Sequence, residues 1–559
     1  MRFTCFFLLL INYNLFAQFP APNLMLVKDY SQSLDQELYF SEKKINTSFK
    51  PIIKSNLSER IYSKFLENKE LDQKYIKKVF TNGLFLLEGQ NYFVSVDPIF
   101  NFNLGREFIE NKNLFINSRG YLVSGNIGDN VSFLTTFMEN QAIFPNYVDS
   151  YISKNKIVPG QGYARYFKQS GYDYAIASGY FSLDFSKIFT MQFGHGKHFI
   201  GDGYRSLFLS DNSFNYPFLR IETKLGKLQY TNLYAELQDI QYFENNSIDN
   251  IDQMGFAKKY MSTHYLDFKI NKKMQLSLFE SVIWRTNHAP GENGFDIQYL
   301  NPIIFLRPVE YSINSPDNML LGLNLKYNVH SSSYAYSQLL LDEFVLDEFK
   351  NDKNFWGNKF GYQFGYKYYD FLTKNLTTQI EYNFVRPYTY AHQNPAQNYG
   401  HYNQPLAHPV GANFSEIILL NNYSFNRFSF NTKFVFIKCG GKIPADPTSF
   451  GNDIYMSTGN FAELNSISTS IIGSGRPDDY NIKMYQGNLT TVNYQSISVS
   501  YLLSKKTNLK CTIEVINRFF KNEDEEMRNK GLGKMPRKAL LDSNQHWDII
   551  TEHADTHAT

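Results

Sequence analysis

A two-residue alternation of apolar and polar side chains runs through the chain from about residue 93. It is clearest in the stretches 360–368, 376–385, 428–436 and 496–503. In 428–436, positions 428, 430, 434 and 436 are all phenylalanine, whereas positions 429, 431 and 433 are Ser, Asn and Lys. Because successive side chains of a β-strand point to opposite faces, each stretch is predicted to be a strand with one apolar and one polar face.

Two kinds of protein satisfy this pattern: a soluble all-β protein and an outer-membrane β-barrel. The chain has 41 Tyr and 50 Phe among 559 residues, yet its mean hydropathy is −0.38. No apolar run approaches the roughly 18 residues of a membrane-spanning helix. A barrel accommodates this composition by placing apolar residues toward lipid at every second position. The net charge of +2 gives no electrostatic argument for nucleic-acid binding.

The lengths of the connections favour the barrel. Tight turns are expected at eight places: near 128–130, 186–187, 226, 271–272, 328–332, 372–374, 426 and 505–507. The intervening connections are long, at about 139–171, 197–216, 240–262, 286–317, 387–413 and 438–490, and only 348–355 is short. Short turns at one end and long loops at the other are typical of outer-membrane barrels, whereas a sandwich would show Greek-key irregularity.

The strand count leaves one position open. Eight hairpins supply sixteen strands, and a strand near 93–103 precedes them, with a long connection expected before the one near 119–126. Bacterial barrels have even strand numbers, so an eighteenth strand should follow residue 520. The tail 521–559 is instead charged and almost without aromatic residues. Either this count is wrong by one, or the C-terminus is altered, for example by a frameshift; we favour the second explanation.

The first residues read as an export signal. Arg2 precedes an apolar run at 6–11, and Leu15 and Ala17 stand where a signal peptidase would read before Gln18. We therefore expect a signal peptide at 1–17 and an outer-membrane location. Residues 18–90 are rich in charged residues, and their apolar residues have a helix-like spacing. This predicts a small, partly helical periplasmic region, with a solvated linker as the alternative. The expected fold is thus all-β, a transmembrane barrel of about eighteen antiparallel strands spanning 91–520.

Many of the residues that could act in catalysis or ligand binding lie in one stretch, FGHGKHFIGDGYRSLFLSDNSFNYPFLRI, at 193–221. His195 and His198 have a metal-like spacing, but flanking glycines disfavour a helix, and Asp202 or Asp211 would have to supply a third ligand. Ser206, His198 and Asp202 are the residue types of a hydrolase, yet the nucleophile elbow G-x-S-x-G is absent. The glycine-rich segment precedes a strand rather than a helix, unlike a nucleotide-binding loop. We predict no catalytic residue, metal or cofactor.

Cys439 and Cys511 are interpreted as isolated thiols, with one disulfide as the alternative.

The same stretch resembles the outer-membrane capsule-assembly family of the Wzi type. The matching pattern is Ser206, Leu207, Leu209, Ser210, Asn212 and Pro217; Gly201-Asp202-Gly203 replaces the family's Gly-Pro-Gly. The segments 137–147, 300–318 and 398–416 are similar to a Bacteroidetes branch with gliding-motility proteins of the RemB type. The resemblance covers about 90–520. It implies an eighteen-stranded barrel with a periplasmic helical part, a role in holding or assembling surface polysaccharide, and a link to gliding.

Sugar binding needs flat aromatic faces and planar polar groups for paired hydroxyls. The candidate glycan-binding residues are His195, Lys197, His198, Asp202, Tyr204, Arg205, Asp211, Asn212, Arg307, Glu310, Arg386 and His401. The competing interpretation is that such side chains brace a wide lumen in paired networks.

The expected partners are surface polysaccharide, outer-membrane lipid and envelope motility or export proteins. Two other functions stay open: a diffusion channel for small solutes, which needs an open lumen, and a scaffold subunit of a surface machine. A lumen filled by 197–216 and the N-terminal region would count against the channel.

Overall fold

A computed structural model describes residues 5–10, 36, 38–40, 46–53, 85–168, 170–186, 188–243, 256–285, 296–303, 305–309, 317–351, 353–443, 446, 448–460, 475–504 and 509–523. Residues 1–4 and 11–17 of the predicted signal peptide, most of the predicted N-terminal region and the tail from 524 lie outside these residues. Among the described residues, no helix is long and apolar enough to cross a membrane.

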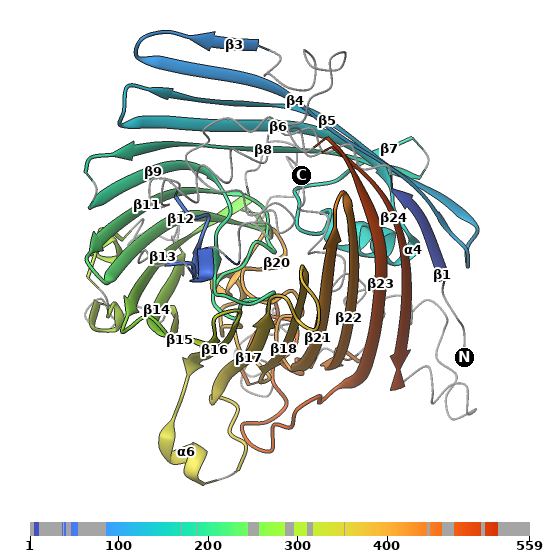
Figure 1. The fold of residues 1–559 in the computed structure, drawn as a ribbon. Coiled ribbons are helices and arrows are strands. Elements are labelled where there is room, and N and C mark those ends of the chain that lie inside the picture. The colour runs from blue at the N-terminus through green and yellow to red at the C-terminus, as the bar shows by residue number, and fades with distance from the viewer. Residues whose placement is uncertain are drawn as a thin grey trace.

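Antiparallel strands, each paired with the next, form the wall of a barrel (Figure 1). Within the described residues, seventeen strands follow one another in the pairing: β4 (Tyr92–Glu107), β5 (Lys112–Ile127), β6 (Val131–Ile143), β8 (Gly171–Asp184), β9 (Phe189–Gly196), β11 (Tyr216–Leu225), β12 (Leu228–Phe243), β13 (Phe256–Lys269), β14 (Met274–Arg285), β15 (Asn318–His330), β16 (Ser333–Glu343), β17 (Lys359–Tyr368), β18 (Leu376–Val385), β21 (Phe414–Phe425), β22 (Phe428–Gly441), β23 (Asn488–Ser504) and β24 (Leu509–Asn522).

The eighteenth place, between β24 and β4, is taken by the start of the chain. β1 (Cys5–Leu10) pairs antiparallel with both strands, Phe6 lying opposite Ile516 on β24 and Glu107 on β4. Near the other end of β4, β3 (Phe85–Glu88) pairs with the same edge. The predicted class, an antiparallel barrel of about eighteen strands, is therefore confirmed, whereas the tail in which the eighteenth strand was expected lies outside the described residues. The segment that occupies the eighteenth place is the apolar part of the predicted signal peptide.

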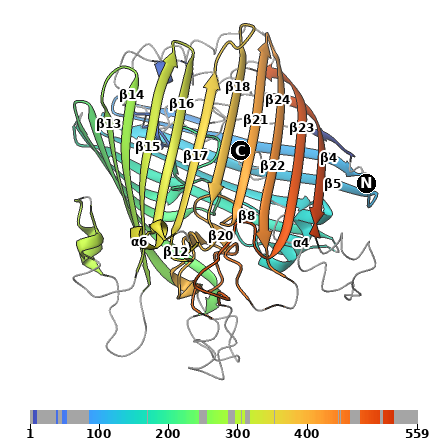
Figure 2. The same ribbon diagram turned by 90° about the horizontal axis from the view of Figure 1, so that it is seen from below.

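The two ends of the barrel differ as the sequence predicts. Seven of the eight expected tight turns join neighbouring strands, and the eighth, at 505–508, lies outside the described residues between the paired strands β23 and β24. The short elements α4 (Asn146–Asn155), α6 (Leu346–Lys350) and β20 (Gln404–Pro405) gather at the opposite end (Figure 2). One expectation was wrong: β4 and β5 are joined by a four-residue turn at 108–111, because both strands extend further than their alternation indicates.

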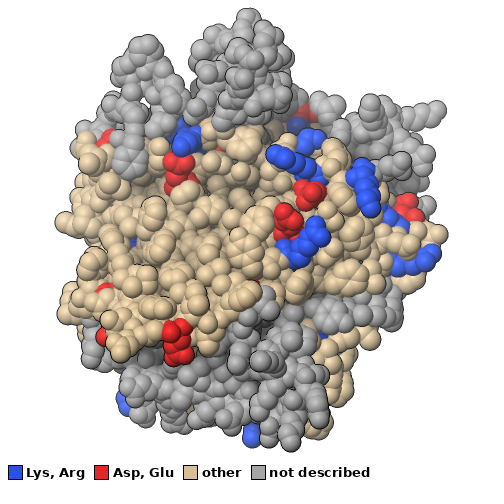
Figure 3. All heavy atoms as spheres, turned by 90° about the horizontal axis from the view of Figure 1, so that it is seen from above, with Lys and Arg blue, Asp and Glu red and all other residues tan. Residues whose placement is uncertain are grey.

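Side chains alternate between an apolar outer face and a polar inner face. On β22, Phe428, Phe430, Phe434 and Phe436 are exposed on the outside, and Lys433 is buried inside. Wide uncharged areas cover the side of the barrel near β4 (Figure 3). An exposed apolar surface this extensive is stable only against lipid, so the wall is that of a transmembrane barrel.

Residues 36, 38–40 and 46–53 of the N-terminal region lie inside the barrel, whereas β3 pairs with its wall. Residues 36 and 38–40 are helical, and Tyr39 stacks on inward-facing Tyr334 with ring centroids 4.6 Å apart. β2 (Phe49–Lys50) pairs with β10 (Phe199–Ile200) within the ring of strands. Both Cys439, which is buried, and Cys511, which is half-buried, are free thiols, so the isolated-thiol interpretation is confirmed.

Candidate functional site

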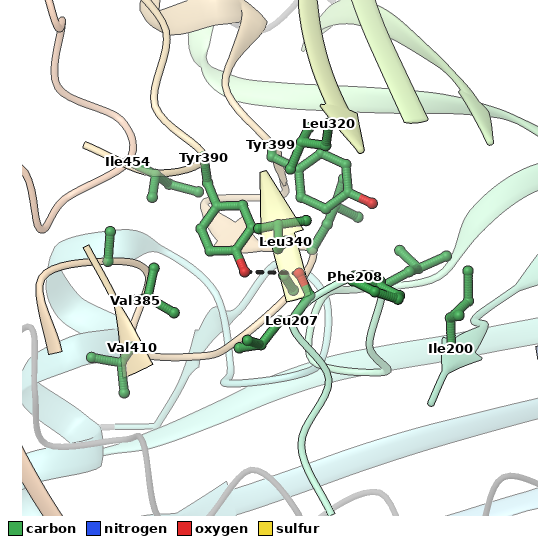
Figure 4. Packing of buried hydrophobic residues seen from close by; sticks show 14 of the residues in the cluster. Ile200, Leu207, Phe208, Leu320, Leu340, Val385, Tyr390, Tyr399, Val410 and Ile454 are labelled. Carbon is green, nitrogen blue, oxygen red and sulfur yellow. Dashed lines mark hydrogen bonds between the residues drawn. The ribbon is translucent and has the colours of Figure 1, made fainter. Parts of the chain in front are cut away.

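The long connection between β9 and β11, residues 197–215, folds into the lumen; we call it the plug segment. Leu207, Phe208 and Leu209 at its centre are wholly buried. The Phe208 ring stacks on inward-facing Phe279 with centroids 4.5 Å apart, and a Cβ at Gly322 would clash with that ring. Leu207 accepts a hydrogen bond from the Tyr390 hydroxyl at 2.8 Å (Figure 4). The lumen thus contains a packed apolar core around the Ser-Leu-Phe-Leu-Ser sequence.

Two buried carboxylates on neighbouring strands hold the plug segment. Glu381 on β18 accepts hydrogen bonds from the backbone N–H groups of Tyr204 and Arg205, at 2.7 and 3.0 Å. Further donors to the same carboxylate are the Tyr336 hydroxyl at 2.7 Å and the Asn383 amide at 2.9 Å. A carboxylate buried with four hydrogen-bond donors is well compensated for its lost hydration. Gly203 allows this close approach, since a Cβ there would lie 2.5 Å from Glu381 Oε2.

Glu416 on β21 completes this arrangement. It pairs with the Arg205 guanidinium at 3.2 Å and accepts from His408 Nε2 at 2.7 Å and from the Asn383 amide at 3.0 Å. Burial lowers the pKa of Arg205, but Glu416, Tyr204 and Glu381 together outweigh burial and hold that pKa above its usual value. We call Glu381, Asn383, Glu416, Arg205 and His408 the lumen network.

The inner N-terminal segment, residues 46–53, occupies the lumen beside the plug segment. The Thr47 hydroxyl donates to Asp202 Oδ1 at 2.9 Å, and the Ser48 hydroxyl donates to Asp267 Oδ2 at 2.8 Å. Arg220 donates to the carbonyl of Pro51 at 2.8 Å, and its guanidinium lies 4.6 Å from the centre of the Phe49 ring. Gly201, with φ of +146°, accepts from Lys50 Nζ. The inner N-terminal segment and the plug segment therefore fill the lumen together.

Two of the predicted histidines, His198 and His401, are buried in the lumen and make internal hydrogen bonds. His401 accepts from the Gln238 N–H through Nδ1 at 2.9 Å, and its Nε2 lies 3.1 Å from the carbonyl of Asn215. Burial lowers the pKa of His401 to about 3. His198 contacts the Tyr216 hydroxyl at 3.2 Å, and burial, followed by the charge of Arg220, holds its pKa well below the ordinary value. These imidazoles are neutral hydrogen-bonding groups in the packed interior.

The residue types of a hydrolase do not form a catalytic chain. The Ser206 hydroxyl donates to the carbonyl of Ile200 and accepts from the Phe208 N–H. His198 bonds to Tyr216, and Asp202 bonds to Thr47, so neither faces Ser206. In the described part of the chain, no group of three or more His, Cys, Asp or Glu side chains lies close enough to hold a metal ion.

The other residues predicted for glycan contact are distributed over several places. Lys197 donates to the carbonyls of Gly160 and Asp211, and burial lowers its pKa to about 7. Asn212 is buried and donates to the carbonyl of Pro405 at 2.9 Å. His195 is the second-last residue of β9, and its Nδ1 lies 3.0 Å from the carbonyl oxygen of Ala177.

Arg307 is exposed outside the barrel wall, far in sequence from the plug segment. Arg386 lies at the base of the loop after β18, its guanidinium 5.5 Å from the centre of the Phe360 ring, and burial lowers its pKa. Glu310 lies outside the described residues. The eleven described candidates therefore do not form a single site.

A surface that sequence reasoning missed lies at the long-connection end, where residues 353–356 and 478–483 meet; we call it the mouth patch. Backbone hydrogen bonds of 2.9 Å join Trp356 N–H to Asp479 and Asn481 N–H to Lys353. Arg476 lies 4.0 Å from the centre of the Trp356 ring and pairs with Asp479 at 2.7 Å. A Trp beside Phe355 in a loop was the available signal, but the second half of the patch is more than 100 residues away along the chain.

The mouth patch combines half-exposed rings with exposed polar side chains. The rings of Phe355 and Tyr480 lie 5.5 Å apart, and both are partly accessible. Lys353, Asp478 and Lys483 are exposed beside them. In such an arrangement the aromatic rings can pack against the C–H-rich face of a sugar, and the charged groups can bind its hydroxyls.

Comparisons with known proteins give only distant structural likenesses. No family model and no curated protein matches the chain. Among solved structures, it is similar to Wzi of Escherichia coli, described as an outer-membrane protein involved in group 1 capsule assembly and a carbohydrate-binding β-barrel. The TM-score is 0.44 at 9% identity, covering 90% of this chain and 98% of that one. OprD of Pseudomonas aeruginosa gives 0.33 at 10% identity, covering 77% and 93%, and OpdO of the same organism gives 0.37 at 10%, covering 78% and 98%. None of these values assigns the chain to a family.

Proposed function

We propose that this barrel is a non-enzymatic outer-membrane protein that attaches surface polysaccharide or helps to assemble it, in the cellular context of gliding motility. The observation that carries the proposal is the filled lumen. A diffusion channel needs a continuous aqueous path, whereas here the plug segment and the inner N-terminal segment pack against the inner wall and against each other. A barrel of this kind serves as an anchored platform for its loops.

The distribution of polar groups refines where glycan would bind. Asp202, Tyr204, Arg205 and His401 are buried, and their hydrogen bonds brace the lumen. The mouth patch, by contrast, offers partly accessible aromatic rings at the end where the long connections gather. We therefore place polysaccharide contact at the mouth patch and assign the buried candidates to bracing.

The Bacteroidetes branch with RemB-type proteins supplies the motility context, and envelope motility or export proteins are the partners proposed with it. The main alternative in that context is a scaffold subunit without glycan affinity. Stable co-purification with other envelope proteins, combined with no binding to polysaccharide, would favour the scaffold. Deleting the protein and measuring capsule and spreading separately would tell the two processes apart.

Binding to the cell's own exopolysaccharide is the direct test. The full-length protein in lipid nanodiscs is titrated with the purified polymer beside a Phe355→Ala/Tyr480→Ala double variant. Removing two rings should weaken binding roughly tenfold, since aromatic contacts contribute about 0.5–1.5 kcal/mol each. Phe364→Ala, an exposed phenylalanine on the lipid-facing wall, is the matched control and should bind normally. If the intact protein fails to bind the polymer, the attachment hypothesis is wrong.

A further inference from the structure

Part of the connection between β14 and β15 lies on the outside of the barrel wall. Residues 296–303 and 305–309, which include η3 (Ile297–Leu300), cover the outer faces of β12, β13 and β14; we call them the outer strap. The Tyr234 hydroxyl donates to the carbonyl of Leu300 at 3.1 Å, and the Asn232 amide donates to the carbonyl of Pro302 at 3.2 Å. Trp284 packs on Tyr299 with ring centroids 4.6 Å apart.

Strand alternation shows that these contacts are on the outer face. On β14, Ser277 donates to Asp267 in the lumen, and Phe279 stacks on the plug segment. Glu280 and Trp284, of opposite parity, therefore point outward. Both are nonetheless almost fully buried, at 1% and 3% exposure, because the outer strap covers them.

Without the outer strap, a polar patch would face lipid. Asn232, His264 and Glu280 all lie on the outer face and are buried. Glu280 accepts hydrogen bonds from two successive backbone N–H groups of the strap, those of Phe305 at 2.6 Å and of Leu306. Phe305 has a φ of +78°, a conformation that is uncommon for an aromatic residue and turns these two N–H groups toward one anion.

The exposed side of the outer strap carries three large apolar side chains, next to the exposed polar residues Gln298, Asn301 and Arg307. Ile297, Ile303 and Phe305 are 73%, 67% and 62% exposed. On neighbouring β15, the exposed apolar residues Leu321, Leu323, Tyr327 and Val329 continue this surface toward the short-turn end, and Met319 passes under the strap. The strap is therefore continuous with the lipid-facing belt of the wall.

The register of β14 and β15 gives the position of the outer strap along the barrel axis. Glu280 lies opposite Leu321, eight residues from Val329 at the short-turn end. At about 3.3 Å per residue and a tilt of about 40°, this corresponds to roughly 20 Å of a belt about 25 Å tall. The outer strap thus lies near the belt's boundary on the long-connection side.

We propose that the outer strap is a membrane-contacting element, whose Ile297, Ile303 and Phe305 side chains insert among lipid acyl chains while its inner side shields the polar patch of the wall. The ligand is the hydrocarbon of the bilayer, and the two N–H groups held by Glu280 fix the strap against the wall. This role is independent of polysaccharide binding.

Spin labels test the proposal in the full-length protein in liposomes, with Cys5, Cys439 and Cys511 replaced by alanine. Labels are placed singly at Ile297→Cys and Ile303→Cys, at Leu323→Cys as the lipid reference, and at Lys353→Cys as the water reference. The ratio of relaxation by oxygen to relaxation by a water-soluble nickel complex is measured for each. We expect both strap labels to lie within about twofold of the Leu323 value.

Two outcomes would overturn the proposal. If the strap labels give the same relaxation ratio as the Lys353 label, the strap is in water. If neither oxygen nor the nickel complex relaxes the strap labels, the strap is covered by protein. Glu280→Ala then tests the attachment: the Ile303 label should lose its lipid-like ratio, whereas Glu236→Ala, on the outer face of β12, should leave it unchanged. An unchanged ratio in Glu280→Ala would show that the carboxylate does not hold the strap.

Discussion

Single buried carboxylates determine where the interior segments lie. Glu381 and Glu416 each combine hydrogen bonds from side chains with contacts to the plug segment, so that the conformation of 203–205 depends on strands far along the chain. Neither residue stands out in the sequence, because a glutamate at an inward position looks like any lumen-facing polar residue. What is distinctive is their setting beside Asn383, which bonds to both.

Glu381→Ala should strongly destabilise the barrel. It leaves two backbone N–H groups, the Tyr336 hydroxyl and an Asn383 amide without their acceptor, and losing one side of such a buried charged network costs about 3–5 kcal/mol. Urea unfolding in lipid, followed by gel mobility, measures the change. Glu110→Ala, in the exposed turn between β4 and β5, is the control and should change the unfolding free energy by at most about 0.5 kcal/mol. Similar losses in the two variants would contradict this account.

The pKa of His401 predicts a dependence of stability on pH. The folded state holds this pKa at about 3, whereas the unfolded chain titrates near 6.5. Between these values the unfolded state binds more protons, so the contribution is complete above about pH 6.5 and falls by about 1.4 kcal/mol per pH unit as pH decreases toward 3. Unfolding free energies at pH 7.5 and 5.0 should therefore differ by about 2 kcal/mol less in His401→Gln than in the wild type. Equal differences would refute the assignment.

At the scale of elements, the strands were predictable and the interior segments were not. The periodicity of 428–436 results from local alternation at a lipid boundary, and the structure has β22 there, with its phenylalanines outside. The plug segment follows no period, because its polar side chains are buried by contacts 131 to 211 residues away along the chain. The same limit explains why the sequence predicted Arg205 as a glycan candidate without indicating its buried ion pair with Glu416.

The lipid-facing assignment of β22 gives a direct mutational test. Phe434→Arg places a cation on the outer face and should lower the unfolding free energy by about 2–4 kcal/mol if the position lies near the bilayer midplane. Phe434→Leu keeps an apolar surface and is the matched control, with a much smaller loss. Denaturant titration in liposomes measures both. An arginine variant as stable as the leucine variant would place this face in water.

At the scale of the whole molecule, the barrel is a wall built around its own packed interior. The Ser48 hydroxyl contacts Asp267, and the segment that carries it fills the lumen beside 197–215. The total number of strands was predictable from turns and parity. The segment at the eighteenth place was not predictable, since β1 is an apolar run of the kind found in signal peptides.

The filled lumen predicts low conductance. In planar bilayers the wild-type protein should show no steady ion current. Ser48→Asp should give open events, because a second carboxylate against Asp267 repels the inner N-terminal segment from its place. Ser48→Ala, which loses the hydrogen bond without adding charge, should stay closed or nearly so. A large, steady current through the wild type would instead support the diffusion channel.

The placement of the plug segment also has a consequence for the order of assembly. Its residues 204–207 are synthesised before their partners Gln338, Glu381 and Glu416, which follow 131, 177 and 211 residues later. Contacts separated by such long stretches of chain form slowly, since the entropy of closing the loop must be lost before any bond is gained. The polar groups of the plug segment therefore lack their hydrogen-bond partners until β18 and β21 have joined the sheet. The interior is completed at a late step of folding, together with the wall rather than before it.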